Sequence, residues 1–126
     1  MNLSAQPPLK PQEFYILLVL TQGESYGYGI SGSVQILSRG AVTIPRNWTY
    51  TLLGKLVTDG LIADAGNRPA GPSYAERKYY QLTNLGRIRL EEEYARLKFA
   101  LEVMAAAGIG QPALPPDIQR LLDSVS

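Results

Sequence analysis

The chain of 126 residues contains neither cysteine nor histidine, and these two absences remove several classes of function. Without cysteine there is no disulfide framework and no thiolate chemistry. Without histidine the chain lacks the commonest general base and the commonest metal ligand. A chain free of disulfides suits the cytosol, so we expect a cytoplasmic protein.

Long apolar segments are also absent. The longest apolar run, Phe14 to Leu20, is far too short to cross a bilayer. The first eight residues contain no charged segment followed by an apolar one, which argues against a signal peptide. We therefore expect no membrane partner. The length and a hydrophobic content of 45% favour one domain, or one domain with a long appended helix.

Candidate catalytic groups are few, and none of them converge. Glu91, Glu92 and Glu93 are consecutive, so on a helix their carboxylates point in different directions. We interpret them as a solvated helix start, favoured by the helix dipole, and not as a metal or acid–base cluster. Ser25 and Ser31 have no histidine and no obvious lysine base nearby in the sequence. The sequence therefore predicts no enzyme.

A glycine pattern that is typical of dinucleotide binding needs separate consideration. The segment from Gly27 to Gly32 fits G-x-G-x-x-G, but the fold also needs an acidic residue about 20 positions later to bind the ribose. No acidic residue lies between Glu24 and Asp59. The chain also has too few strand–helix units for a doubly wound sheet. We therefore predict no cofactor and no metal.

The total charge of +1 says little about partners, but the charge is unevenly distributed. The segment from Arg39 to Arg89 holds eight basic and three acidic residues, a net +5, which leaves −4 for the rest of the chain. A basic segment of this kind favours a nucleic-acid partner, and ordinary scatter of surface charge is the alternative.

The first two helices are predicted from their end signals. Pro11 suits a first helical position, and the helix it begins should be buried on most sides; a buried strand is the alternative. Ser25 is the predicted cap of a second helix that stops near Gly40. An extended linker should follow, ending at Pro45.

A third helix is predicted from Arg46 to Gly60. Its core-facing residues should be Thr49, Leu53, Leu56 and Val57. The opposite face should present Asn47, Trp48, Thr51, Lys55 and Thr58. Such a face, polar with a single charge, is unusual for a merely solvated helix and typical of one that reads base edges.

Two short strands, 61–63 and 78–82, should follow the third helix. Between them Gly66, Pro69, Gly71 and Pro72 should prevent regular structure, with Arg68 near the tip of the loop. Thr83 or Asn84 should cap a long helix that runs to about Ala107.

The long helix has an apolar seam that repeats every 3.5 residues, the pattern for pairing with a partner helix. Its members are Leu90, Tyr94, Leu97, Leu101 and Met104. A Gly- and Pro-rich link should lead to a final amphipathic turn, Asp117 to Leu122. The predicted organisation is a flexible arm (1–10), a DNA-binding domain (11–83), a dimerisation helix (84–107), and the link with a short helix (108–126).

Three segments resemble the PadR family of winged-helix transcriptional regulators. Residues 25–30 resemble the opening of the family's second helix, with Gly29 in place of the usual acid. Residues 49–62 resemble the recognition helix and first wing strand, with Tyr50 at the family's characteristic tyrosine. Residues 77–87 resemble the second wing strand and the start of the dimerisation helix. Trp48 and Thr49 depart from the family pattern, so base preference cannot be carried over.

The resemblance extends from about Glu13 to Met104 and is to the short branch of the family, with one long C-terminal helix. It implies a mainly α, α+β fold: a winged helix-turn-helix with a C-terminal dimerisation helix. It also implies a homodimeric repressor of double-stranded DNA promoters, in some members relieved by a small phenolic or drug-like effector. The compact length and Pro-rich start additionally resemble the clock-associated Pex proteins of that family.

Within this interpretation the DNA-binding residues fall into three groups. Asn47, Trp48 and Thr51 are the candidates for base edges, although Trp48 could instead be a core indole or stack on a ligand. Tyr50 could pack while its hydroxyl reaches a phosphate. The candidates for the DNA backbone are Arg46, Lys55, Arg77 and Lys78, which should neutralise phosphates, and Arg68, which should reach the adjacent backbone or minor groove. The alternative function is a protein-interaction or ligand-sensing module with little affinity for DNA.

Overall fold

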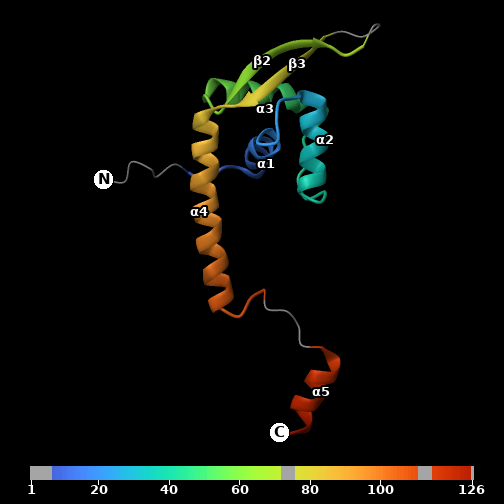
Figure 1. The fold of residues 1–126 in the computed structure, drawn as a ribbon, viewed down its shortest axis with the longest axis vertical. Coiled ribbons are helices and arrows are strands. Elements are labelled where there is room, and N and C mark those ends of the chain that lie inside the picture. Colours follow the sequence, from blue (N-terminus) through green and yellow to red (C-terminus); the bar gives the residue numbers. More distant parts are fainter. Residues whose placement is uncertain (1–6, 72–75, 111–114, 126) are drawn as a thin grey trace, which may run out of the picture. The chain divides into compact units, whose positions relative to one another are not determined.

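A computed structural model describes residues 7–71, 76–110 and 115–125 (Figure 1). The elements in chain order are α1 (Pro11–Leu20), β1 (Ser25–Tyr26), α2 (Gly27–Leu37), α3 (Arg46–Thr58), β2 (Ile62–Pro69), β3 (Glu76–Leu82), α4 (Asn84–Ala106) and α5 (Pro116–Ser124). This order, three helices followed by a two-strand wing and a long helix, confirms the predicted mainly helical winged-helix fold.

The hydrophobic core lies between α1, α2, α3 and the strands. Helix α1 supplies four buried apolar residues, which confirms a helix buried on most of its sides. The fully buried side chains elsewhere are Ile30, Val34, Leu53, Leu56 and Ile62. In α3 the buried face includes Leu52, whereas Val57, predicted to face the core, is 37% exposed. The face is therefore rotated slightly from the predicted one, toward Thr49 and Leu52.

The start of α2 differs from the prediction. Ser25 does not cap the helix; it forms β1 with Tyr26, and these residues pair with Tyr80 and Tyr79 of β3. The helix begins at Gly27 without a side-chain cap. Pairing with β3 fixes the backbone before the helix, so the sheet has three strands in the order β1-β3-β2.

The wing is longer and more regular than predicted. Strands β2 and β3 pair from Ile62↔Leu82 out to Pro69↔Glu76 and run together beside α3 (Figure 1). The strand is interrupted only by a bulge between Asp64 and Gly66, and pairing continues beyond it to Pro69. At the bulge Gly66 adopts φ +96° and donates its N–H to the Asp64 carboxylate at 2.7 Å. Of the predicted loop, Pro72 lies outside the described residues.

The start of α4 is fixed tightly to the domain. Thr83 caps the helix, as predicted: its Oγ1 accepts the N–H of Gly86 at 3.0 Å and donates to the carbonyl of Gly60 at 2.6 Å. A Cβ atom at Gly86 would clash with the carbonyl oxygen of Leu61, so only glycine fits this crossing.

The described part of the predicted flexible arm is held against α4. The backbone N–H of Leu9 donates to Glu93 at 3.3 Å, and Arg89 donates to the carbonyl of Pro7 at 3.1 Å. Leu9 also packs against the core. Residues 7–10 thus belong to the folded domain, while residues 1–6 lie outside the described part.

The chain divides into two compact units, residues 1–94 and 95–126. The first contains the winged helix and the first turns of α4. The second contains the rest of α4 and the short helix α5, whose described residues are all exposed. Across the three described ranges no helix is both long and apolar enough to span a membrane.

Candidate nucleic-acid interface

The outer side of α3 carries a ridge of small uncharged residues. Asn47, Thr51, Gly54 and Thr58 recur at intervals of 4, 3 and 4 residues, which places them on one line of the helix, and all four are exposed. We call these four residues the α3 ridge. A Cβ atom added at Gly54 would meet no atom of the chain within 4 Å, so packing does not require this glycine. The ridge offers hydrogen-bonding groups and room for close approach.

Trp48 lies on one flank of the ridge and is not a core residue. It is 49% exposed, which rules out the interpretation of its indole as part of the hydrophobic core. A half-exposed indole remains available to a groove or to a flat ligand.

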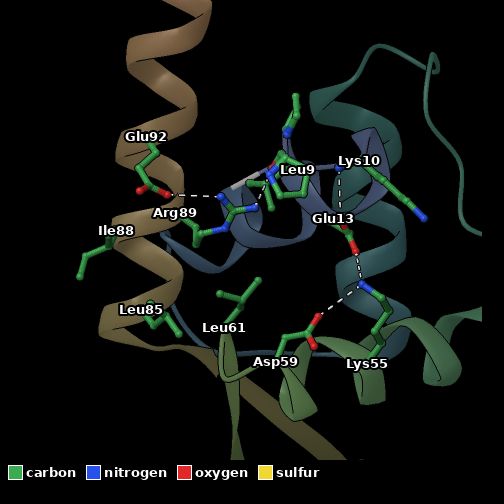
Figure 2. A pocket seen from close by; sticks show the side chains of 12 residues that line it. Leu9, Lys10, Glu13, Lys55, Asp59, Leu61, Leu85, Ile88, Arg89 and Glu92 are labelled. Atoms are coloured by element: carbon green, nitrogen blue, oxygen red, sulfur yellow. Dashed lines mark hydrogen bonds and ion pairs between the residues drawn. The ribbon is translucent and has the colours of Figure 1, made fainter. Parts of the chain in front are cut away.

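Lys55, on the same flank, is already paired. Its ammonium lies 2.7 Å from a Glu13 carboxylate oxygen and 3.3 Å from Asp59. Figure 2 shows that the Lys55 side chain reaches both carboxylates. Burial alone would raise the pKa of Glu13, but the hydrogen bonds from Lys55 and from the backbone N–H of Lys10 outweigh it and hold that pKa below its ordinary value. The hydrogen bond to Glu13 likewise raises the pKa of Lys55. Lys55 therefore joins α3 to α1, and its charge is largely compensated.

Tyr50 and Arg46 lie on the other flank. The Tyr50 ring covers the backbone of Gly27, where an added Cβ would lie 3.1 Å from the ring, so Gly27 permits the close approach of α2 to α3. The Arg46 guanidinium lies 5.1 Å from the centre of the Tyr28 ring. These residues line a cavity of about 310 Å³ between α2 and α3. The tyrosine ring thus positions a cation at the start of α3.

The outer face of the wing carries two arginines on tyrosine rings. Arg68 and Arg77 are direct cross-strand partners. The Arg68 guanidinium lies 4.2 Å from the Tyr79 ring centre, and that of Arg77 lies 4.2 Å from the Tyr26 ring centre. Arg68 also forms an ion pair with Glu24. Arg68 therefore stands within β2, not at the tip of a loop.

Lys78 alternates with its neighbours and points to the opposite side of β3. It lies 3.5 Å from Asp64. The backbone N–H of Gly66 and the Lys78 ammonium together hold the pKa of Asp64 below its ordinary value. The three wing cations are thus divided between two faces of the sheet.

A second, larger cavity of about 730 Å³ lies between the N-terminal segment, the end of α3 and the first turns of α4 (Figure 2). Leu61, Leu85 and Ile88 form its apolar part. Its charged groups include the Lys55–Glu13–Asp59 cluster and the Arg89–Glu92 pair at 3.3 Å. The cavity is therefore lined by charged as well as apolar groups.

The predicted seam residues of α4 differ in their surroundings. Leu90 is partly buried and packs against the core of its own domain. The other four, Tyr94, Leu97, Leu101 and Met104, are exposed, with Leu101 at 65%. Four large apolar residues on one line of a helix form a surface that pairing with another helix would bury.

The carboxylates of the acidic run in α4 do not converge. Glu92 pairs with Arg89, whereas Glu93 turns inward and accepts the Leu9 N–H, so the carboxylates diverge as predicted. The prediction that this run is solvated is wrong for Glu93, which is buried. In the parts of the chain that the structure describes, no group of acidic residues could hold a metal ion.

Sequence reasoning missed the residues that support the arginines. The Arg46 guanidinium lies over the ring of Tyr28, that of Arg68 over Tyr79, and that of Arg77 over Tyr26. Arg68 also pairs with Glu24, which is 44 positions earlier in the chain. No local sequence signal links residues so far apart. The alternation of Arg77 and Tyr79 along β3 was the one available signal, because it places both on the same face.

Comparisons with known proteins agree with this geometry. The family profile described as "Transcriptional regulator PadR-like family" matches residues 16–92. A PadR family transcription regulator from hypervirulent Clostridium difficile R20291 is 27% identical with a TM-score of 0.64, over 77% of this chain and 97% of that one. The PadR-like regulator BC4206 from Bacillus cereus strain ATCC 14579 is 26% identical with a TM-score of 0.61, over 79% and 92% of the two chains.

Bacillus subtilis PadR, solved in complex with operator DNA, is 21% identical with a TM-score of 0.57, over 85% of this chain and 51% of that one. At this identity the likeness shows the fold alone. No curated protein matches the chain significantly. Because the family profile covers more than half of its residues, the chain belongs to the transcriptional regulator PadR-like family, whose members are winged-helix DNA-binding regulators and not enzymes.

Proposed function

We propose that the protein is a homodimeric repressor that binds double-stranded operator DNA and acts by occupying a promoter. In this proposal α3 enters the major groove, where Asn47, Thr51 and Trp48 contact base edges. Arg46, Arg68 and Arg77 contact the flanking phosphates. The observation that carries the proposal is the exposed, uncharged α3 ridge beside arginines that tyrosine rings hold in place.

The distribution of charge supports a reading helix rather than a solvated one. A solvated surface helix usually presents lysine and glutamate, whereas the α3 ridge has no charged residue. Base edges are read by short polar side chains and by close backbone approach, and the ridge offers both. Lys55 and Lys78 contribute less to phosphate binding in this proposal, because both already have carboxylate partners.

The exposed seam of α4 supports a dimer. An apolar surface that includes Leu97 and Leu101 is unfavourable in water and indicates an interaction site. Pairing of two such helices would place two recognition helices on one face of DNA, about 34 Å apart for half-sites one helical turn apart. Bacillus subtilis PadR, which shares the fold, was solved in complex with operator DNA, which supports DNA as the partner in this proposal.

The alternative is a protein-interaction or ligand-sensing module with weak affinity for DNA. Two observations favour it: Lys55 is neutralised by Glu13, and a cavity of about 730 Å³ adjoins α3 and α4. We retain part of it, proposing that a small apolar effector occupies this cavity. Regulation of a clock gene rests only on resemblance in length and N-terminal composition to Pex proteins, and none of the three relatives above is a Pex protein.

The salt dependence of binding to the protein's own promoter region separates the two functions. A repressor should bind this DNA tightly, and its affinity should fall steeply as salt rises, because phosphate contacts release counterions. Binding that is weak, or equal for promoter and unrelated DNA at every salt concentration, would favour the interaction module.

A further inference from the structure

The outer face of the wing holds two like charges directly opposite one another. Arg68 of β2 and Arg77 of β3 are cross-strand partners, an arrangement that is unfavourable unless something compensates for it. Each guanidinium lies 4.2 Å from the centre of a tyrosine ring, and the rings of Tyr26 and Tyr79 are themselves 5.5 Å apart. The two guanidinium groups are therefore held next to each other by a pair of neighbouring tyrosine rings.

A single carboxylate from outside the wing compensates for one of these charges. Glu24, immediately before β1, forms an ion pair with Arg68, and both side chains are partly exposed, at 38% and 44%. Among the described residues Arg77 has no ion pair, although its sheet position is equivalent. Of the two arginines, Arg68 thus has an anionic partner, whereas Arg77 has none among the described residues.

A carboxylate and a phosphate present similar oxygens to a guanidinium group. We propose that Arg68 and Arg77 form a clamp for a backbone phosphate of DNA, and that Glu24 is an internal competitor that the phosphate must displace from Arg68. This inference rests on the proposed function, in which the wing contacts DNA. It gives Glu24 a role in setting the affinity for DNA, although Glu24 and the DNA backbone are both negatively charged.

The competitor should lower the affinity for all DNA to the same extent. Arg77 would make the first contact, and Arg68 would exchange one anion for another. The displaced Glu24 carboxylate would then take up a cation from solution, which offsets part of the counterion release from the DNA. Glu24 should therefore reduce both the affinity and its dependence on salt, without changing the preferred sequence.

The test compares Glu24→Gln with Glu76→Gln, which makes the same charge change on the opposite face of β3. Both variants are titrated with promoter and with unrelated DNA at several salt concentrations. Glu24→Gln should tighten binding to both DNAs by about twofold to fivefold per wing and steepen the salt slope by up to roughly 1. Glu76→Gln should change binding much less, and in an Arg68→Ala background the two glutamine variants should behave alike.

The outcomes separate this inference from the function on which it rests. If Glu24→Gln and Glu76→Gln behave alike while the parent protein binds its promoter in a salt-dependent way, the competitor role is overturned and the repressor function stands. If the parent protein shows no salt-dependent binding of DNA, both are overturned. A gain confined to promoter DNA would also contradict the inference, because a phosphate clamp does not read sequence.

Discussion

The α3 ridge and the outer face of the wing are both exposed, yet they are built from opposite kinds of residue. The ridge has three short polar side chains and one glycine, and none of these residues is charged. The wing face has two arginines, two tyrosines and an ion pair that reaches from Glu24. One surface offers short-range hydrogen bonds and space, and the other offers charge that acts on any phosphate.

This difference suggests that specificity and general affinity reside on separate elements. Short side chains on a helix are placed by the backbone and lose little entropy on contact, so the ridge suits discrimination between bases. Long arginine side chains normally lose much more, but the tyrosine rings already restrict them. In the proposed function the wing would therefore bind phosphate without reading sequence.

The largest effect should come from the dimer, because the division assumes two copies of both surfaces. Leu97→Asp together with Leu101→Asp would bury charges against apolar partners at a cost of several kcal/mol. We expect monomers in sedimentation and a loss of operator affinity of about a hundredfold or more. Phe99→Asp is the matched control, since Phe99 is exposed on the opposite side of α4. If only the control variant is monomeric, the interface lies on that opposite side.

Next in size are the ridge residues. Asn47→Ala and Thr51→Ala should each weaken operator binding tenfold or more, because a lost base contact costs ~1–3 kcal/mol. Their melting temperatures should stay nearly unchanged, since both side chains are exposed. Thr43→Ala, the same chemical change in the linker before α3, is the control. Normal operator binding by both ridge variants would remove α3 from the reading role.

A smaller, non-specific effect is expected for the wing. Arg77→Ala should weaken promoter and unrelated DNA alike, by about fivefold, and lower the salt slope by roughly 1. Lys78→Ala should matter less, because Lys78 lies on the other face and is paired with Asp64. An effect of Arg77→Ala confined to one operator position would make Arg77 a base reader and break the division.

A substitution at Gly54 should raise the stability of the protein and lower its affinity for the operator. Gly54→Ala should stabilise the protein by about 0.5–1 kcal/mol, since alanine is the better helix former and open space surrounds the site. The added methyl group should nevertheless weaken operator binding severalfold if DNA approaches the ridge closely. Thermal melting and a binding titration on the same sample check both parts. Improved stability with unchanged binding would show that DNA does not approach Gly54.

The smallest effect concerns Glu13 and is measured as a change in stability. Because its folded-state pKa is depressed, Glu13 contributes stability above its ordinary pKa and loses it as the pH falls through the folded value. The melting temperatures of Glu13→Gln and the parent protein should therefore differ most at neutral pH and converge in acid. Glu91→Gln makes the same chemical change at an exposed position and should melt close to the parent protein at neutral pH. A constant difference for Glu13→Gln across the pH range would contradict the role of the Lys55 pair.

The sequence predicted the helices well because their signals are local. Pro11 and Glu13 mark the start of α1, Gly60 follows the end of α3, and Thr83 caps α4. The strands were predicted less well. A strand as short as β1 has no periodicity of its own and exists only through pairing with β3, more than 50 residues later. A glycine such as Gly66 normally predicts the end of a strand, but here it forms a bulge beyond which β2 continues.

The exposed face of α3 was predicted in outline, but the charge pairing around it was not, and the binding role of these residues stays a prediction. Residue types and helical spacing identified the outer side of α3, and the structure places Asn47 and Thr51 there. The ion pairs Lys55–Glu13 and Arg68–Glu24 span 42 and 44 residues, so no local pattern could reveal that two of the predicted DNA-binding cations are compensated. Trp48 is 49% exposed even though α3 is rotated so that Leu52, and not Val57, joins the core. The sequence alone had left a core position for its indole open.

The most direct test of the division is the ratio of operator affinity to unrelated-DNA affinity, measured at one salt concentration for the parent protein, Thr51→Ala and Arg77→Ala. If α3 reads sequence and the wing binds only phosphate, we expect Thr51→Ala to lower this ratio about tenfold. Arg77→Ala should weaken both affinities and leave the ratio unchanged. The opposite pattern, with the ratio preserved in Thr51→Ala and lost in Arg77→Ala, would contradict this division and place sequence reading on the wing.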